Sequence, residues 1–131
     1  MQHTILLIED KPGLRDTIQS LLELHQYQVI TAANGEEGIH MATEHLPDLV
    51  ISDIYMPVLN GYQLLEAFRA HEQLRYIPVI ILSARSATEE VSLAIEKGAA
   101  AYINKPFLFA NLNASIQQLL QTTSGSAPLT L

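Results

Sequence analysis

Short aliphatic runs alternate five times with longer segments of helical periodicity, and this alternation restricts the possible folds most strongly. The runs predict strands at residues 4–8, 28–32, 48–52, 78–82 and 101–104. The first, third and fourth runs are apolar on both faces, which is typical of strands covered by helices on each side of a sheet. Since successive strands joined through helices run parallel with right-handed crossovers, the sequence predicts a doubly wound α/β domain.

Apolar residues that follow each run recur at the spacing of one helix face. They are Leu14, Ile18, Leu21 and Leu22; Ile39 and Ala42; Leu64, Leu65 and Phe68; Val91, Ala94 and Ile95; and Leu112, Ile116, Leu119 and Leu120. Asn34-Gly35, followed by two glutamates, predicts a helix start, and Ser86 with Glu89 has the spacing of a capping box. Gly98 is expected to end the fourth helix.

The chain length of 131 residues suits one domain, and 48% apolar residues suit a globular core. We expect this domain to span residues 1–121, because 122–131 are rich in Ser, Thr, Gly and Pro and indicate a flexible tail or the start of a linker. No apolar run approaches the ~20 residues of a membrane-spanning helix. The N-terminus lacks the pattern of a signal peptide.

The charge balance limits the partners of the domain. Lys and Arg number 7 against 14 Asp and Glu, for a formal charge of −7, which disfavours direct binding to nucleic acid or to an anionic membrane. Cys is absent, so disulfides and thiolate metal sites are excluded, and a cytoplasmic location is permitted. We expect charged partners to bring basic groups or metal ions.

Polar residues that suit phosphate chemistry follow four of the five predicted strands. They are Glu9-Asp10, Asp53, Ser83 and Lys105-Pro106. In the flavodoxin-like strand order 2-1-3-4-5 the first and third strands are neighbours, so the three carboxylates meet at one sheet edge. Carboxylates so close together need a positive counterpart, and their hard oxygen atoms suit Mg²⁺. Lys105 supplies a further positive charge.

Each of these residues also has an ordinary structural interpretation. Asp10 suits a helix N-cap, Asp53 a turn residue, Ser83 a cap for the next helix, and Lys105 a solvated surface charge. Asn60-Gly61 is interpreted first as a turn. The placement of all the strand-end residues on one sheet edge favours a shared site over four unrelated roles.

The combined pattern resembles the receiver domain of two-component response regulators, from residue 3 to about residue 121. The residues that carry the resemblance are Glu9-Asp10, Asp53 in "DIYMP", Asn60-Gly61, Ser83 in "ILSA", and Tyr102, Lys105 and Pro106 in "YINKPF". The spacings between Asp53, Ser83 and Lys105 also fit that family.

The resemblance implies that Asp53 accepts a phosphoryl group from a phosphohistidine of a sensor histidine kinase or phosphotransfer protein. Mg²⁺, for which Mn²⁺ can substitute, would be held by Asp10, Asp53 and the backbone carbonyl of Tyr55, with Glu9 assisting through water. Such a protein is a signalling domain that assists its own phosphorylation and dephosphorylation, and is not an enzyme in the usual sense.

The resemblance also implies how the signal leaves the site. Lys105 and Ser83 would contact phosphoryl oxygens, and the Lys105-Pro106 peptide matches a position that is typically cis. Ser83 would move toward the phosphoryl group and Tyr102 would turn inward, changing the surface of the fourth helix, fifth strand and fifth helix. That surface would control an unidentified output partner or domain, and could support a homodimer.

Two residues depart from the commonest pattern of the family. Tyr55 is a bulky aromatic two residues after Asp53, and Arg85 places a cation two residues after Ser83. Our hypothesis is that they tune the lifetime of the phosphorylated state by screening it from water. Ser83 stands where Thr is common and keeps the hydroxyl.

Two other functions fit parts of this pattern. A pseudo-receiver would use the same fold as a binding scaffold without phosphorylation, and the intact set of strand-end residues disfavours it. A phosphatase of the haloacid dehalogenase type would carry a second aspartate two positions after Asp53, where this chain has Tyr55.

Overall fold

The computed structural model describes residues 2–85 and 87–123 and contains a parallel sheet of five strands. The strands are β1 (Thr4–Ile8), β2 (Gln28–Ala32), β3 (Leu49–Ser52), β4 (Val79–Ser83) and β5 (Ala101–Asn104). Their order, β2-β1-β3-β4-β5, confirms the predicted flavodoxin-like topology. Each strand lies within one residue of its predicted bounds.

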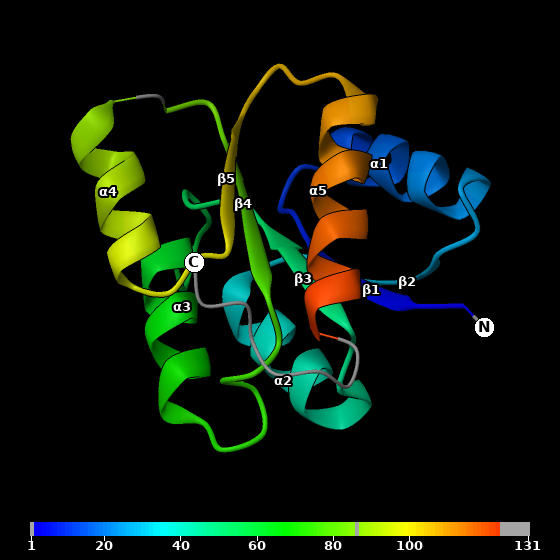
Figure 1. Cartoon of the computed structure of the whole chain (residues 1–131). Helices are drawn as coiled ribbons and strands as arrows, with labels where there is room; N and C mark the ends of the chain where they lie inside the picture. The colour runs from blue at the N-terminus through cyan, green and yellow to red at the C-terminus, as the bar shows by residue number, and fades with distance from the viewer. Residues whose placement is uncertain (1, 86, 124–131) are drawn as a thin grey trace.

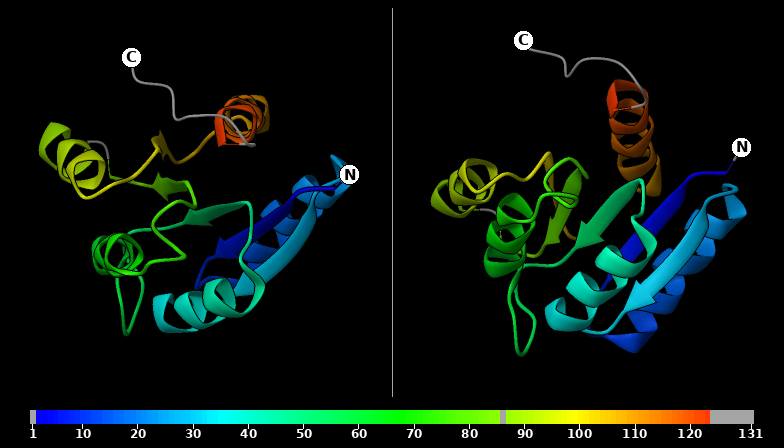
Figure 2. Two further views of the ribbon diagram at one scale, coloured as in Figure 1. Left: turned by 60° about the horizontal axis from the view of Figure 1, so that its bottom comes forward. Right: turned by 90° about the horizontal axis from the view of Figure 1, so that it is seen from below.

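Among the described residues, five helices cover the two faces of the sheet (Figure 1, Figure 2). One face carries α1 (Pro12–Leu24) and α5 (Phe109–Thr123), and the other carries α2 (Gly35–His45), α3 (Gly61–Ala70) and α4 (Thr88–Glu96). Helix α5 continues to Thr123, two residues beyond the predicted domain boundary, and the rest of the predicted tail lies outside the described residues. None of the helices in the described part of the chain has the length and apolar character needed to cross a bilayer.

Alternate residues of each strand belong to separate hydrophobic clusters, as a sheet buried on both faces requires. In β1, Ile5 and Leu7 pack with Ile18 of α1 and Ile116 of α5, whereas Leu6 and Ile8 pack on the opposite side. The second cluster includes Leu64, Leu65 and Phe68 of α3 and Ala94 of α4. The strands are therefore held rigidly along their length, and their carboxyl ends are fixed in position.

Two of the three predicted helix-end signals are confirmed, and the third includes a residue outside the described part of the chain. Asn34 is the N-cap of α2 and accepts a hydrogen bond from the Glu37 amide, as predicted. Gly98 follows α4 with a φ of 114°, and its amide and that of Ala99 close the helix end, which confirms the predicted stop. The N-cap of α4 is Ala87, without a side-chain hydrogen bond, and Ser86 lies outside the described residues.

The interpretation of Asn60-Gly61 as a turn was wrong, because these residues begin α3. The Asn60 side chain accepts a hydrogen bond from the Gln63 amide, and the Gln63 side chain accepts one from the Asn60 amide, which forms a capping box. The Gly61 amide donates to the Ile54 carbonyl at 2.7 Å. The start of α3 is thus fastened directly to the chain that follows Asp53.

We predict that Gly61→Ala lowers the free energy of unfolding by about 1–3 kcal/mol, measured by urea denaturation. A Cβ atom at this position would stand 2.7 Å from both the Asp53 carbonyl oxygen and the Ile54 Cα, and backbone atoms cannot move aside cheaply. Gly13→Ala in α1 is the matched control. A Cβ there meets no atom within 4 Å, so the variant should be neutral or gain up to about 1 kcal/mol. Equal stability of the two variants would contradict the prediction.

Candidate functional site

Three carboxylates gather at the carboxyl ends of β1 and β3. Ile8 pairs with Ser52 in the sheet, so the residues that follow them, Glu9 and Asp53, are neighbours. Glu9, Asp10 and Asp53 each offer an oxygen within 4.8 Å of the others. Glu9 is 2% exposed and Asp53 is 7% exposed, so this negative charge is largely removed from solvent. A nearby cation would offset the repulsion between these carboxylates.

Lys105 provides one positive charge to this cluster. Its Nζ donates to Asp53 Oδ2 at 2.7 Å and to Glu9 Oε1 at 3.1 Å. The Lys105 amide donates to the Ser83 carbonyl at 2.8 Å, which fixes the backbone from which the side chain extends. Because β4 lies between β3 and β5, the Lys105 side chain reaches Asp53 across the end of β4.

Burial and ion pairing shift the pKa values of Glu9 and Lys105. Burial raises the pKa of Glu9 above its ordinary value, and the nearby Lys105 charge opposes this effect without cancelling it. Burial alone would lower the pKa of Lys105, but its hydrogen bond to Asp53 and the charges of Asp53 and Glu9 outweigh burial and raise it. Lys105 therefore stays protonated at neutral pH.

Asp10 is not the N-cap of α1, as its ordinary interpretation suggested, because Lys11 holds that position. One Asp10 oxygen, Oδ1, is buried without a hydrogen-bond partner among the described residues. An unpaired buried carboxylate oxygen is costly, and a metal ion would satisfy it. Asp53 does make the local contacts of a turn residue, since its Oδ1 accepts from the Ile54 amide at 2.6 Å and from the Tyr55 amide at 3.4 Å, but its Oδ2 is held by Lys105.

Ser83 and Tyr102 meet at the backbone of Arg85 rather than at Asp53. The buried Ser83 Oγ accepts from the Arg85 amide at 3.1 Å. The Arg85 carbonyl accepts from the Tyr102 hydroxyl at 2.7 Å and from the Asn104 side-chain amide at 2.8 Å. The peptide bond between Lys105 and Pro106 is cis. The structure thus brings the predicted residues to one sheet edge, with the loop after β4 tied to β5.

Comparison with known proteins decides the family. Residues 5–117 match the family described as the response regulator receiver domain. The chain belongs to this family. It is 37% identical over 125 residues to the response regulator Rre1 of Synechocystis, covering 95% of this chain and 54% of that protein. It is 36% identical over 123 residues to the transcriptional regulatory protein PrrA of Mycobacterium tuberculosis, covering 94% and 52%. The chain therefore spans about half the length of these curated relatives.

Solved structures agree with this assignment. The receiver domain of a signal transduction histidine kinase from Syntrophus aciditrophicus superposes with a TM-score of 0.88 at 33% identity, covering 98% of each chain. The receiver domain of a sensor histidine kinase from Pseudomonas aeruginosa PAO1, described with a magnesium ion coordinated in its active site cleft, gives 0.86 at 30% identity, covering 92% of this chain and 99% of that one. Receiver domains are signalling domains of two-component systems, and bind Mg²⁺ at an acidic pocket.

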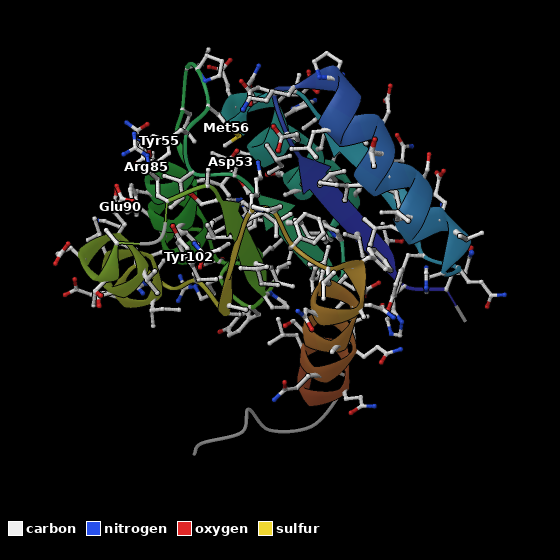
Figure 3. The ribbon with its side chains drawn as sticks, turned by 90° about the horizontal axis from the view of Figure 1, so that it is seen from above. Asp53, Tyr55, Met56, Arg85, Glu90 and Tyr102 are labelled. Atoms are coloured by element: carbon white, nitrogen blue, oxygen red, sulfur yellow. The ribbon has the colours of Figure 1, made fainter. Side chains whose placement is uncertain are left out.

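The receiver domain also has a polar contact at the rim of the strand-end site, which the sequence did not predict. The Tyr55 hydroxyl donates to Glu90 Oε1 of α4 at 2.6 Å, and the Arg85 guanidinium carbon lies 4.9 Å from the centre of the Tyr55 ring (Figure 3). Glu90 was overlooked because a glutamate in the first turn of a helix is ordinary. Its pairing partner lies 35 residues away, and no local pattern connects the two.

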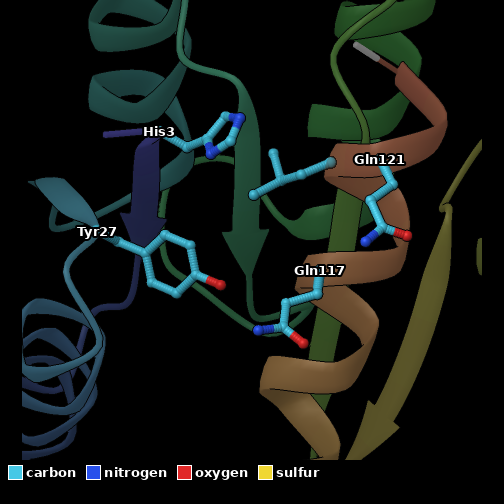
Figure 4. Close-up of a pocket in the computed structure, with 5 residues that line it drawn as sticks. His3, Tyr27, Gln117 and Gln121 are labelled. Carbon is cyan, nitrogen blue, oxygen red and sulfur yellow. The ribbon is translucent and has the colours of Figure 1, made fainter. Parts of the chain in front are cut away.

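A separate pocket lies near the opposite edge of the sheet, where the strands begin. It is lined by His3, Tyr27, Gln117, Leu120 and Gln121 (Figure 4). The Tyr27 hydroxyl donates to the Asn113 side-chain oxygen at 2.8 Å, which joins the start of β2 to α5. The strand-end carboxylates of the receiver are at the other edge, so this pocket is not part of the predicted site.

We predict that Tyr55 does not ionise below about pH 11. Its hydrogen bond to Glu90 raises the pKa of the phenol from 10.0 to about 12, and this bond stabilises the fold below pH 10.0 and is lost as the pH rises through about 12. The difference in tyrosinate absorbance between the wild type and Tyr55→Phe should therefore stay near zero to about pH 11. In a Glu90→Ala background the same difference should appear near pH 10. A wild-type difference near pH 10 would contradict the hydrogen bond.

Proposed function

We propose that this receiver accepts a phosphoryl group on Asp53 from a phosphohistidine and thereby changes its α4-β5-α5 surface. The observation that supports it best is the bridging of Asp53 and Glu9 by Lys105 Nζ, at 2.7 and 3.1 Å. An isolated strand-end aspartate would need no such partner. A lysine held there is already placed to meet the additional negative charge of a phosphoryl group.

The proposed reaction needs little covalent chemistry from the protein. An Asp53 carboxylate oxygen forms a bond to phosphorus while the bond from phosphorus to the donor imidazole nitrogen breaks, and that nitrogen leaves with the electron pair. The Lys105 ammonium holds the Asp53 carboxylate in position through its 2.7 Å hydrogen bond to Oδ2. The Lys105 ammonium then exchanges its hydrogen bond to the carboxylate for one to a phosphoryl oxygen. Its charge therefore acts both before and after the phosphoryl transfer.

The acidic cluster fits the magnesium ion implied by the family. Asp10 and Asp53 would hold it directly, with the Tyr55 carbonyl as a further ligand and Glu9 assisting through water; Mn²⁺ could take the same place. The unpaired buried Oδ1 of Asp10 supports this assignment, because oxygen donors of this kind suit a hard cation. When bound, the ion neutralises negative charge on the transferring phosphoryl oxygens.

The proposed switch uses Ser83 and Tyr102. The Ser83 hydroxyl would turn from its contact with the Arg85 amide toward a phosphoryl oxygen, and Tyr102 would leave the Arg85 carbonyl and turn inward. Both hydrogen bonds belong to the loop after β4, so one movement of that loop breaks both. The phosphoryl group acts as the ligand that selects the second arrangement.

The proposed phosphodonor is a sensor histidine kinase or a phosphotransfer protein. An apolar groove beside Lys105, lined in part by Leu14 and Ile18 of α1 and by Phe107, suits a helix that presents a histidine. The output partner or domain is reached through the α4-β5-α5 surface, which could also pair two copies of the chain. We propose a cytoplasmic role without direct contact to nucleic acid.

We predict one phosphate adduct per chain after incubation with Mg²⁺ and acetyl phosphate or phosphoramidate, measured by intact mass. Asp53→Ala should give none, because the attacking oxygen is gone, and Asp10→Asn or removal of divalent cations should suppress it. Asp16→Ala is the matched control, since Asp16 is an exposed aspartate of α1, and it should be labelled like the wild type. No adduct on the wild type, or an undiminished one on Asp53→Ala, would reject the proposed function.

We predict that Tyr55→Asn combined with Arg85→Ala speeds dephosphorylation about tenfold, equivalent to ~1.4 kcal/mol of barrier. Tyr55 and Arg85 are bulky side chains from the loops on either side of the site, so each limits the approach of water to the phosphorylated aspartate whether or not the two stack. The rate is measured by loss of the phosphate adduct after the donor is removed. Arg75→Ala with Tyr76→Asn removes the same two residue types from an exposed connection and should leave the rate unchanged. An unchanged rate in the first variant would contradict the screening role.

A further inference from the structure

Three residues join separate segments of the chain at the rim of the site. Tyr55 comes from the loop after β3, Arg85 from the loop after β4, and Glu90 from the first turn of α4 (Figure 3). We name these three residues the rim cluster. Its contacts are the 2.6 Å hydrogen bond from Tyr55 to Glu90 and the stacking of Arg85 over the Tyr55 ring at 4.9 Å.

The position of the Glu90 side chain depends on its hydrogen bond with Tyr55. Its Oε2 is buried without a hydrogen-bond partner in the described part of the chain, and its Oε1 receives the Tyr55 hydroxyl. The backbone carbonyl of Glu90 accepts from the Tyr62 hydroxyl of α3 at 3.4 Å, which holds the first turn of α4 close. A partly buried carboxylate with one donor loses most of its compensation when that donor is removed. Tyr55 and Glu90 therefore hold each other in position.

The rim cluster acts on the same loop as the proposed switch. The side chain of Arg85 stacks on Tyr55, while its backbone binds Ser83 and Tyr102. Movement of Ser83 toward a phosphoryl group displaces the Arg85 backbone, and this movement works against the contacts of the Arg85 side chain. The loop after β4 is thus restrained from the β3 side and the β5 side together.

We propose that the rim cluster is a latch that favours the unphosphorylated arrangement, with Glu90 as a positioning residue that acts through Tyr55. The latch rests on the proposed function, since it regulates the switch of that same site. Contacts made in one of two arrangements shift the population toward it, and a ligand of the other arrangement must overcome them. Loss of one hydrogen bond to a partly exposed carboxylate should change the equilibrium roughly threefold to tenfold.

The test is the affinity of the whole chain for beryllofluoride with Mg²⁺, a stable probe of the phosphorylated carboxylate, measured by calorimetry. Tyr55→Phe keeps the ring and removes the hydroxyl, and Glu90→Ala removes the acceptor. Each should tighten binding roughly threefold to tenfold, because each releases the latch. The double variant should bind no more tightly than either single variant, since both remove one contact. Glu90→Gln keeps an acceptor oxygen and should return the affinity toward wild type.

Glu89→Ala is the control, because it removes the same charge from the same turn of α4 at an exposed position, and its affinity should equal that of the wild type. Wild-type affinity in Tyr55→Phe and Glu90→Ala would overturn the latch, as would effects that multiply in the double variant. An equal gain in Glu89→Ala would also overturn it, since charge alone would then explain the result. A wild type that binds no beryllofluoride would overturn the proposed function itself, and the latch with it.

Discussion

The pairing of Lys105 with Asp53 and Glu9 is the interaction on which the site depends. Two like charges about 4 Å apart repel by about 4 kcal/mol at an effective dielectric near 20, and burial adds to the cost. The sheet concentrates negative charge at the ends of β1 and β3, and Lys105 crosses the end of β4 to offset it. The strand order and the register therefore serve one electrostatic requirement.

The features that sequence reasoning predicted correctly are those with a local or topological cause. Strand positions follow from aliphatic runs, and the strand order follows from the doubly wound arrangement of such units. In a parallel sheet the carboxyl ends of adjacent strands share an edge, so residues such as Glu9 and Asp53 meet without further information. The carboxylate cluster could therefore be predicted from the positions of the strands in the sequence.

The features that were missed depend on competition between alternatives of similar energy. Asn-Gly suits a turn and a helix start equally, and the capping partner Gln63 decides for the helix. Asp10 is a good N-cap residue, but Lys11 precedes the helix, and Asp10 turns to the acidic cluster. The bond from Tyr55 to Glu90 depends on side-chain directions and on the packing of α4, which no spacing rule specifies.

Helix α4 differs from its neighbours in how it is attached. Its one fully buried residue is Ala94, whereas every other helix buries at least two residues. Polar contacts near the surface also attach it, among them the ion pair of Lys97 with Glu66 and the hydrogen bond of 2.7 Å from Arg69 to the Glu96 carbonyl. Hydrophobic burial resists motion at any salt concentration, but surface charge pairs are screened. The position of α4 is therefore the part of the fold most responsive to ionic strength, and its amide hydrogens should exchange with solvent before those of α3.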